Sequence, residues 1–169
     1  MIVLVGFMGA GKSTVGRQLA RTLGLPFTDA DQAIEEQAGQ PIREIFATAG
    51  EEAFRDLERE VITGLLTAPE DAVLALGGGA VETAAIRAAL AGHQVVFLQI
   101  SLDEALARVG HDTGRPLLGD PDLAGLFARR QDRYAAVAAI TVRVGADRTA
   151  AEVSGETIRR LRPGCGPVS

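Results

Sequence analysis

The segment GFMGAGKST at residues 6–14 constrains the fold of this chain more than any other feature. It follows a short apolar run at residues 1–5 and precedes a stretch with helical periodicity. Glycines allow positive φ angles and close approach of the backbone, so that successive N–H groups and the start of the next helix hold phosphate oxygens. The segment therefore predicts a phosphate-binding loop (P-loop) at the first strand-to-helix junction, with a nucleoside triphosphate as its ligand.

The loop residues have distinct expected roles. Lys12 is expected to contact the β- and γ-phosphates, and Ser13 is expected to coordinate Mg²⁺. An ordinary glycine turn is the alternative, and the position of the loop between a strand and a helix disfavours it. The residues expected to bind ATP in this loop are Gly9, Ala10, Gly11, Lys12, Ser13 and Thr14.

Short apolar or β-branched runs alternate with helical patterns along the chain, which is typical of β-α units around a mostly parallel sheet. We expect an α/β fold of three layers, with a five-stranded parallel sheet flanked by helices. Ligands of such sheets bind beyond the carboxyl ends of the strands, where the P-loop, Asp29, Asp31 and the glycines at 77–79 all fall. The expected strands are 2–5, 27–29, 72–76, 95–100 and 140–144. The expected helices are 15–23, 33–38, 84–90, 103–109 and 150–161.

The length of 169 residues suits one domain, and we expect a single P-loop domain over residues 1–169. Two segments depart from the simple alternation. Residues from about 32 to 67 predict a helical substrate-binding insertion that walls the acceptor side of the cleft. Residues from about 110 to 122, rich in Gly, Pro and Asp, predict a mobile lid. The tail at 162–169 is expected to be flexible.

Composition and charge bound the possible partners. The net charge of −5 argues against a nucleic-acid or anionic-membrane partner. No apolar run approaches the roughly 18 residues of a membrane span, and no cleavable signal is evident at the N-terminus. We therefore expect a cytoplasmic protein, and a monomer because no long apolar patch exceeds the core pattern. The single cysteine, Cys165, excludes an intramolecular disulfide, and His93 and His111, without partners at metal-site spacing, are expected at the surface.

Two carboxylates, Asp29 and Asp31, end the second expected strand. We expect their side chains to point to opposite sides and to take two roles. One would face Mg²⁺ through its water shell, and the other would face an acceptor hydroxyl as its orienter or general base. The alternative is that one of them only caps the helix that follows.

Three consecutive glycines at residues 77–79 follow the apolar strand AVLAL. Because glycine loses much conformational entropy on folding, such a run indicates backbone that lies close against another group. A bound substrate is one interpretation of this run, and a tight strand-to-helix turn is the other.

Three arginines are candidates for binding anions. Arg55 lies on the expected helix of the insertion, and Arg130 lies in FARRQDRY near the end of another helix. Their guanidinium groups suit a planar carboxylate. Arg129 and Arg133 beside Arg130 make a surface position the alternative for that residue. Arg115, in the expected lid, is placed to move onto the transferring phosphate.

At this level of detail the chain resembles the shikimate kinase family, P-loop kinases with the fold of the nucleoside-monophosphate kinases. The resemblance extends from residue 1 to about residue 161. It implies transfer of the γ-phosphate of ATP to the 3-hydroxyl of shikimate, with Mg²⁺, in the biosynthesis of chorismate and the aromatic amino acids. The motifs that carry it, in this order, are GFMGAGKSTVGRQLA, DADQAIE, IREIFATAGEEAFRDLE, LALGGGAV and TGRPLL.

The resemblance also implies the roles of individual residues. Lys12, Asp31 and Arg115 match the catalytic positions, with Asp31 placed to orient or deprotonate the acceptor hydroxyl and Arg115 on the lid. Ser13 and Asp29 match the positions that hold Mg²⁺. The residues that match the shikimate-binding positions are Asp31, Arg55, Gly77, Gly78, Gly79 and Arg130. The residues that match nucleotide-binding positions outside the P-loop are Arg108, Arg115 and Arg148.

One motif departs from the family pattern. Where the family commonly has Arg-x-Pro-Leu-Tyr, this chain has RQDRY at residues 130–134. Arg130 is matched through its position four residues before Tyr134, which puts both side chains on one helical face. Arg133 is the rival candidate for the second arginine that binds the acceptor carboxylate.

Two other functions remain as alternatives. The first is a gluconate or nucleotide kinase of the same fold, although a nucleotide acceptor would need side chains that recognise a base. The second is a catalytically silent ATP-binding module, against which the presence of Lys12, Asp31 and Arg115 argues. Shikimate is therefore the expected small-molecule partner.

Overall fold

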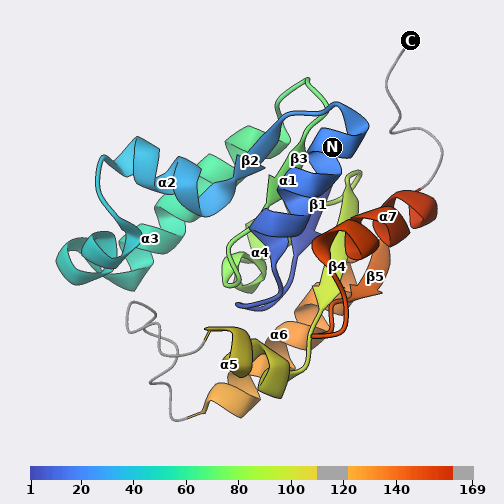
Figure 1. Cartoon of the computed structure of the whole chain (residues 1–169). Helices are drawn as coiled ribbons and strands as arrows, with labels where there is room; N and C mark the ends of the chain where they lie inside the picture. The colour runs from blue at the N-terminus through green and yellow to red at the C-terminus, as the bar shows by residue number, and fades with distance from the viewer. Residues whose placement is uncertain (110–121, 162–169) are drawn as a thin grey trace.

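In the computed structural model of the chain, which describes residues 1–109 and 122–161, five parallel strands form one sheet in the order β2-β3-β1-β4-β5 (Figure 1). The strands are β1 (Ile2–Val5), β2 (Phe27–Asp29), β3 (Val73–Ala75), β4 (Gln94–Gln99) and β5 (Ile140–Arg143). The helices are α1 (Lys12–Leu23), α2 (Ala30–Ala38), α3 (Ile42–Leu66), α4 (Ala84–Ala89), α5 (Leu102–Val109), α6 (Leu123–Val137), α7 (Ala150–Arg160) and the 3₁₀ helix η1 (Ala80–Glu82). The expected three-layer α/β fold is confirmed.

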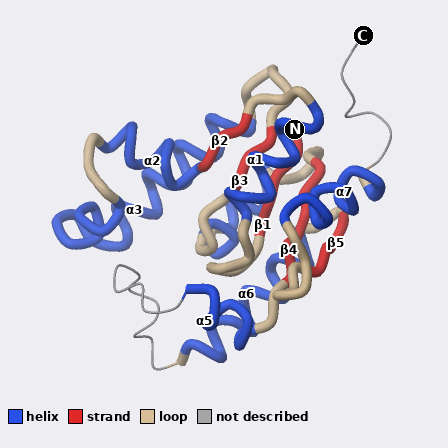
Figure 2. Tube along the Cα trace, in the orientation of Figure 1, coloured by secondary structure: helices blue, strands red, loops and turns tan. Residues whose placement is uncertain are grey.

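Strands β1 and β3, in the middle of the sheet, are apolar along their whole length because helices cover both faces of the sheet. Every residue of β1 and β3 is buried. In the register of the sheet, Leu4 lies between Ala75 on one neighbour and Val96 on the other. Helices α1 and α7 pack side by side on one face, and α4 and α6 belong to the other layer (Figure 2). This core holds the carboxyl ends of the strands at one edge.

Helices α2 and α3 extend beyond the β2 edge of the sheet, and together they form an arm (Figure 1). The arm has an apolar cluster of its own around Ile34, Ile45, Phe54 and Val61. The insertion is helical as expected, but α3 breaks at Gly50, whose φ of 85° and ψ of 175° lie outside the helical region. Only glycine adopts such a φ easily. The bent helix α3 contacts both α2 of the arm and α4 of the sheet layer.

The element boundaries differ from the expected ones chiefly at helix starts. Helices α1 and α2 each begin three residues earlier than the sequence patterns predict. For α2 the reason is the carboxylate of Asp29, which accepts a hydrogen bond from the backbone N–H of Asp31 and so caps the helix at its first turn. Helix α1 begins directly at the P-loop, after Gly11 in the left-handed conformation.

Several predictions from the sequence fall outside the described residues. These are the lid, except for its last residue Asp122, and the tail with Cys165, together with Arg115 and His111. His93, expected at the surface, is partly exposed in the turn before β4, and its partial burial lowers its pKa. Across residues 1–109 and 122–161, no helix has both the length and the apolar character of a membrane span.

Candidate active site

The P-loop connects β1 to α1 at the carboxyl edge of the sheet. Gly9 and Gly11 have φ values of 76° and 79°, and a Cβ atom on Gly9 would lie 2.9 Å from the carbonyl oxygen of Ala105. Lys12 Nζ donates hydrogen bonds to the carbonyl oxygens of Gly6 and Phe7, at 2.9 and 3.2 Å. These bonds hold the ammonium group against the loop, next to a cavity of about 370 Å³ that we call the loop cavity.

The expected phosphate and metal residues come together around the loop cavity. Its lining includes Gly9, Gly11, Lys12, Ser13, Thr14, Asp29, Asp31 and Arg108. Ser13 Oγ donates a hydrogen bond to Asp29 Oδ2 over 2.5 Å. A hydroxyl and a carboxylate are oxygen ligands of the kind that Mg²⁺ prefers, and Mg²⁺ takes its remaining ligands from phosphates and water. The pair therefore fits a magnesium ion that is bound together with a triphosphate.

Asp29 and Asp31 lie in different elements, and not on opposite faces of one strand as expected from the sequence. The strand ends at Asp29, while Asp31 lies in the first turn of α2. The expectation of opposite directions from strand alternation was therefore wrong: residues two apart in a strand share a face, and Asp31 is not in the strand. Asp29 both caps α2 and accepts the hydrogen bond from Ser13, so the capping interpretation and the metal interpretation apply to the same side chain.

Asp31 lies at the junction of two cavities. It lines the loop cavity and also a larger cavity of about 690 Å³, which we call the arm cavity because α3 of the arm supplies much of its wall. Gly78 is likewise shared by the two cavities. The apolar lining residues of the arm cavity are Ile42, Phe46, Phe54 and Leu126. The charged lining residues are Asp31, Glu51, Arg55, Glu58, Glu82 and Arg130.

Arg55 reaches the arm cavity from the second half of α3. Its NH1 group donates to Glu58 Oε2 over 2.7 Å, and its NH2 group donates to Glu51 Oε1 over 3.4 Å. The guanidinium carbon also lies 5.2 Å from the centre of the Phe54 ring. Glu58 is only 1 % exposed. Burial raises the pKa of Glu58, and the hydrogen bond from Arg55 opposes that rise.

Each glycine at residues 77–79 lies against a different polar side chain. A Cβ atom on Gly77 would overlap the carboxylate of Asp31, and one on Gly79 would lie 2.7 Å from Arg55 NH1. The carbonyl oxygen of Gly78 accepts a hydrogen bond of 2.6 Å from the hydroxyl of Tyr134. The run is thus a turn before η1 and also a backbone surface on which the charged groups of the arm cavity pack.

Tyr134 connects this turn to the core. Its ring is fully buried and lies 5.3 Å from the ring of Phe97 on β4. Burial raises the pKa of Tyr134, so the hydroxyl stays protonated and donates to Gly78. The tyrosine therefore fixes the position of the glycine turn relative to β4.

Arg130 occupies a buried position on α6. Its side chain is 4 % exposed, its guanidinium carbon lies 6.0 Å from the Phe7 ring centre, and burial lowers its pKa. The surface position considered for Arg130 is therefore wrong. Arg133 is 38 % exposed, and among the described residues Arg130 but not Arg133 lines the arm cavity. This placement favours Arg130 over its rival.

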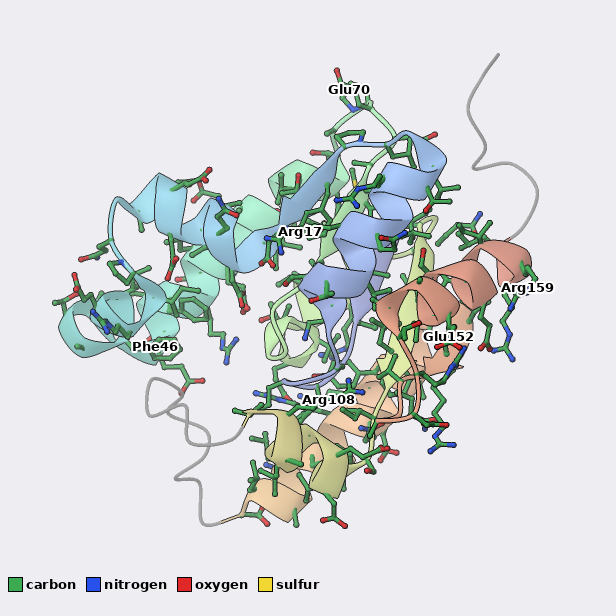
Figure 3. The ribbon with its side chains drawn as sticks, viewed as in Figure 1. Arg17, Phe46, Glu70, Arg108, Glu152 and Arg159 are labelled. Carbon is green, nitrogen blue, oxygen red and sulfur yellow. The ribbon has the colours of Figure 1, made fainter. Side chains whose placement is uncertain are left out.

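Arg108 and Arg148 line a third cavity of about 280 Å³ beside the P-loop. Arg108 donates to the carbonyl oxygens of Gly9 at 3.2 Å and Gly145 at 2.6 Å, and Figure 3 shows it beside the β1–α1 loop. Arg148 NH2 pairs with Glu156 over 2.7 Å. The third cavity shares Gly9, Gly11, Thr14 and Arg108 with the loop cavity, so the two adjoin at the P-loop.

Among the described residues, the polar contributors that the sequence reasoning missed are Glu51, Glu58, Glu82 and the hydroxyl of Tyr134. Glu58 carried a usable signal, because it lies three residues after Arg55 on one helical face. Glu82 and the tyrosine hydroxyl carried none, since their partners lie 48 and 56 residues away in the chain.

The three cavities adjoin one another, with the P-loop in the middle and a charged pocket beyond Asp31. A phosphoryl group held by the P-loop and a small acceptor held in the arm cavity would meet beside Asp31. The fold and this geometry define a P-loop phosphotransferase for a small acceptor molecule.

Comparisons with known proteins agree with this class. A sequence profile of the shikimate kinase family matches residues 8–162. The shikimate kinase of Mycobacterium avium (strain 104) is 52 % identical over 144 residues, which cover 83 % of this chain and 81 % of the relative. The shikimate kinase of Mycobacterium tuberculosis (strain ATCC 25177 / H37Ra) is 51 % identical over 150 residues, covering 86 % and 84 %. The chain belongs to the shikimate kinase family and is a kinase.

Solved structures place the fold in the same family. Shikimate kinase from Acinetobacter baumannii, solved in complex with shikimate, has a TM-score of 0.86 and 37 % identity, covering 94 % of this chain and 90 % of that one. The enzyme from Aquifex aeolicus has a TM-score of 0.81 and 34 % identity, covering 95 % of both chains. A gluconokinase from Sinorhizobium meliloti shares the fold at a TM-score of 0.61 and 22 % identity, with 94 % and 89 % covered. The gluconate alternative is therefore not favoured.

Proposed function

We propose that the chain transfers the γ-phosphate of ATP to the 3-hydroxyl of shikimate, giving shikimate 3-phosphate and ADP on the route to chorismate and the aromatic amino acids. One observation carries this proposal: Asp31 stands where the loop cavity meets an arm cavity that contains two arginines, Arg55 and Arg130. A small hydroxylated carboxylate matches that arrangement, because guanidinium groups bind carboxylates and a carboxylate binds hydroxyls.

On the nucleotide side, Lys12 is proposed to hold the β- and γ-phosphates, while the backbone of residues 9–14 holds their oxygens. Ser13 and Asp29 are proposed to hold Mg²⁺, which neutralises phosphate charge when it is bound. Arg108 and Arg148 are proposed to enclose the adenine, since both line the cavity next to the P-loop. These roles require no residue of the arm.

On the acceptor side, Arg55 and Arg130 are proposed to bind the carboxylate, and the backbone of residues 77–79 the ring hydroxyls. Asp31 is proposed to orient the 3-hydroxyl and to accept its proton. The hydroxyl oxygen forms a bond to the γ-phosphorus, the bond from that phosphorus to the bridging oxygen breaks, and ADP leaves with the electron pair. Arg115, which lies outside the described residues, is proposed to reach the transferring phosphate from the lid.

The proposed partner is shikimate alone, with no nucleic acid or membrane. The net charge of −5 supports this, because a polyanionic partner would be repelled. We also propose a single domain and a cytoplasmic monomer. Light scattering coupled to size exclusion tests the monomer, and a mass of twice the chain would overturn it.

A coupled assay of ADP release with ATP and Mg²⁺ tests the function. Shikimate is compared with gluconate, with a panel of nucleoside monophosphates and with no acceptor. Release that depends on shikimate supports the proposal. Release with another acceptor would leave the P-loop roles intact and overturn the assignment of the arm cavity. Tight ATP binding without release in the presence of any acceptor would favour the silent module.

A further inference from the structure

Glu82 bridges two arginines of α6. It is the last residue of η1, directly after the glycine turn. Its Oε1 atom accepts a hydrogen bond of 3.2 Å from Arg130 Nε, and its Oε2 atom forms an ion pair with Arg133. Arg130 and Arg133 are three residues apart on α6 and so lie on one helical face. A single carboxylate thereby joins the buried arginine of the arm cavity to a more exposed one.

This carboxylate faces the arm cavity, where it creates a difficulty for an anionic ligand. The described lining contains four carboxylates, Asp31, Glu51, Glu58 and Glu82, against the two guanidinium groups of Arg55 and Arg130. A carboxylate ligand must therefore compete with carboxylates of the protein for these guanidinium groups. Competition is strong in a partly buried site because charges there are poorly screened by solvent.

The geometry of the bridge limits that competition. Arg130 uses its Nε edge toward Glu82, and a guanidinium group held by this edge can still present its NH1 and NH2 donors end-on to a ligand carboxylate. Arg133 pairs with the other oxygen of Glu82, so the negative charge of Glu82 is shared between two cations. Glu82 is 26 % exposed and Arg130 only 4 %, so the carboxylate reaches the arginine from the more open side.

We infer that Glu82 and Arg133 are positioning residues for Arg130: Glu82 fixes the orientation of its guanidinium group, and Arg133 neutralises Glu82 so that it does not compete with the acceptor carboxylate. This inference rests on the proposed function.

The test measures kcat and KM for shikimate at saturating ATP and Mg²⁺ in three variants. Arg133→Leu leaves Glu82 without its counter-charge, so KM should rise roughly tenfold while kcat changes less than about twofold. Adding Glu82→Gln to Arg133→Leu should bring KM back to within about threefold of the unaltered chain, because an amide oxygen still accepts from Nε without the charge. Arg129→Leu is the control, since it removes a cation from the same helix that pairs with Asp122 and not with Glu82.

A purely structural role predicts a different pattern. If the ion pair only held α6 in place, the double variant would be as impaired as Arg133→Leu, and that outcome overturns the inference. Glu82→Gln alone provides a second arm that does not depend on the folding of Arg133→Leu. Its KM for shikimate should stay the same or fall. A severalfold rise would overturn the inference, because the charge of Glu82 would then help to hold the acceptor rather than compete with it.

Measurements on the unaltered chain distinguish failure of the proposed function from failure of the inference alone. Absence of shikimate-dependent ADP release by the unaltered chain overturns the proposed function and, with it, the inference. Normal release combined with an unchanged KM in Arg133→Leu overturns the inference alone. A KM increase in Arg129→Leu equal to that in Arg133→Leu would also overturn it, because the effect would then be general loss of positive charge.

Discussion

The two sides of the site are built in different ways. The phosphate side is nearly contiguous in sequence, since the backbone of residues 9–14 supplies it together with Asp29 and Arg108. The arm cavity is assembled from α2, α3, the glycine turn, η1 and α6, and its cations are held by protein carboxylates. Backbone donors define a site by local conformation, whereas paired side chains define it by long-range contacts. Variants should therefore affect the two sides differently.

The largest expected effect falls on the phosphate side. Lys12→Ala removes the ammonium group that the P-loop carbonyls hold, and kcat should fall by about a hundredfold or more, on the order of 3 kcal/mol in the transition state. The KM for shikimate should change little, because Lys12 lies outside the lining of the arm cavity. Steady-state ADP release with both substrates varied gives the two numbers separately.

The matched control is Arg17→Ala. Arg17 lies on the same helix, and its guanidinium carbon lies 5.2 Å from the centre of the Phe27 ring rather than beside the loop (Figure 3). Its kcat should stay within about twofold of the unaltered chain. Equal decreases of kcat in Lys12→Ala and Arg17→Ala would mean that loss of any positive charge from α1 lowers kcat, and that Lys12 has no special role.

The second largest effect falls on the arm cavity. Arg55→Ala should weaken acceptor binding by about 2–4 kcal/mol, because the acceptor carboxylate would lose its partner and Glu58 would be left buried without one. The KM for ATP should stay unchanged. The control, Arg59→Ala, lies one turn further along α3 in an exposed pair with Asp56 and should have no effect on either KM. An unchanged KM for shikimate in Arg55→Ala would show that the carboxylate site is misassigned.

The same contrast explains how far the sequence could predict the structure. The glycine spacing of the P-loop, the alternation of apolar runs and the order of the motifs are local signals. The fold, and the grouping of the P-loop with Asp29 and Asp31 around one cavity, could therefore be predicted from them. The break at Gly50 and the bridge from Glu82 to α6 depend on which segments meet in space. No local sequence pattern predicts these long-range contacts. Asp31 shows the limit most plainly, because its position in a helix turn rather than a strand depended on the cap formed by Asp29.

A smaller effect tests how tightly the arm cavity is packed. Gly79 has a φ of −88°, which alanine tolerates, but a Cβ atom there would lie 2.7 Å from Arg55 NH1. Gly79→Ala should therefore displace the Arg55 guanidinium and raise the KM for shikimate by roughly tenfold, or about 1.4 kcal/mol, with the KM for ATP unchanged.

Gly64→Ala is the matched control for that packing. Gly64 lies in α3, and a Cβ atom there would meet nothing within 4 Å. The substitution should leave both KM values unchanged and stabilise the fold by about 0.5–1 kcal/mol, because alanine favours a helix interior. Equal KM values in Gly79→Ala and the unaltered chain would show that Arg55 moves aside without loss of binding.

The smallest expected effect is on the pH dependence of the free energy of unfolding, and it comes from a buried carboxylate of the arm cavity, Glu58. Burial raises the pKa of Glu58 above the ordinary glutamate value of 4.5, and the hydrogen bond from Arg55 offsets part of that rise. The folded chain therefore binds this proton more tightly than the unfolded chain does. The free energy of unfolding should consequently fall as pH rises from 4.5 through the raised pKa.

Glu58→Gln tests this sign, because glutamine stays neutral at every pH. Urea unfolding in steps from pH 4.5 to neutral should show the unaltered chain losing stability relative to Glu58→Gln as pH rises. Glu52→Gln, at an exposed position of α3, should keep the pH slope of the unaltered chain. Parallel curves for Glu58→Gln and the unaltered chain would mean that Arg55 fully offsets the burial of Glu58. The Glu58–Arg55 pair would then add nothing to the pH dependence of the free energy of unfolding. The arm cavity would differ from the phosphate side only in the arrangement of its binding groups.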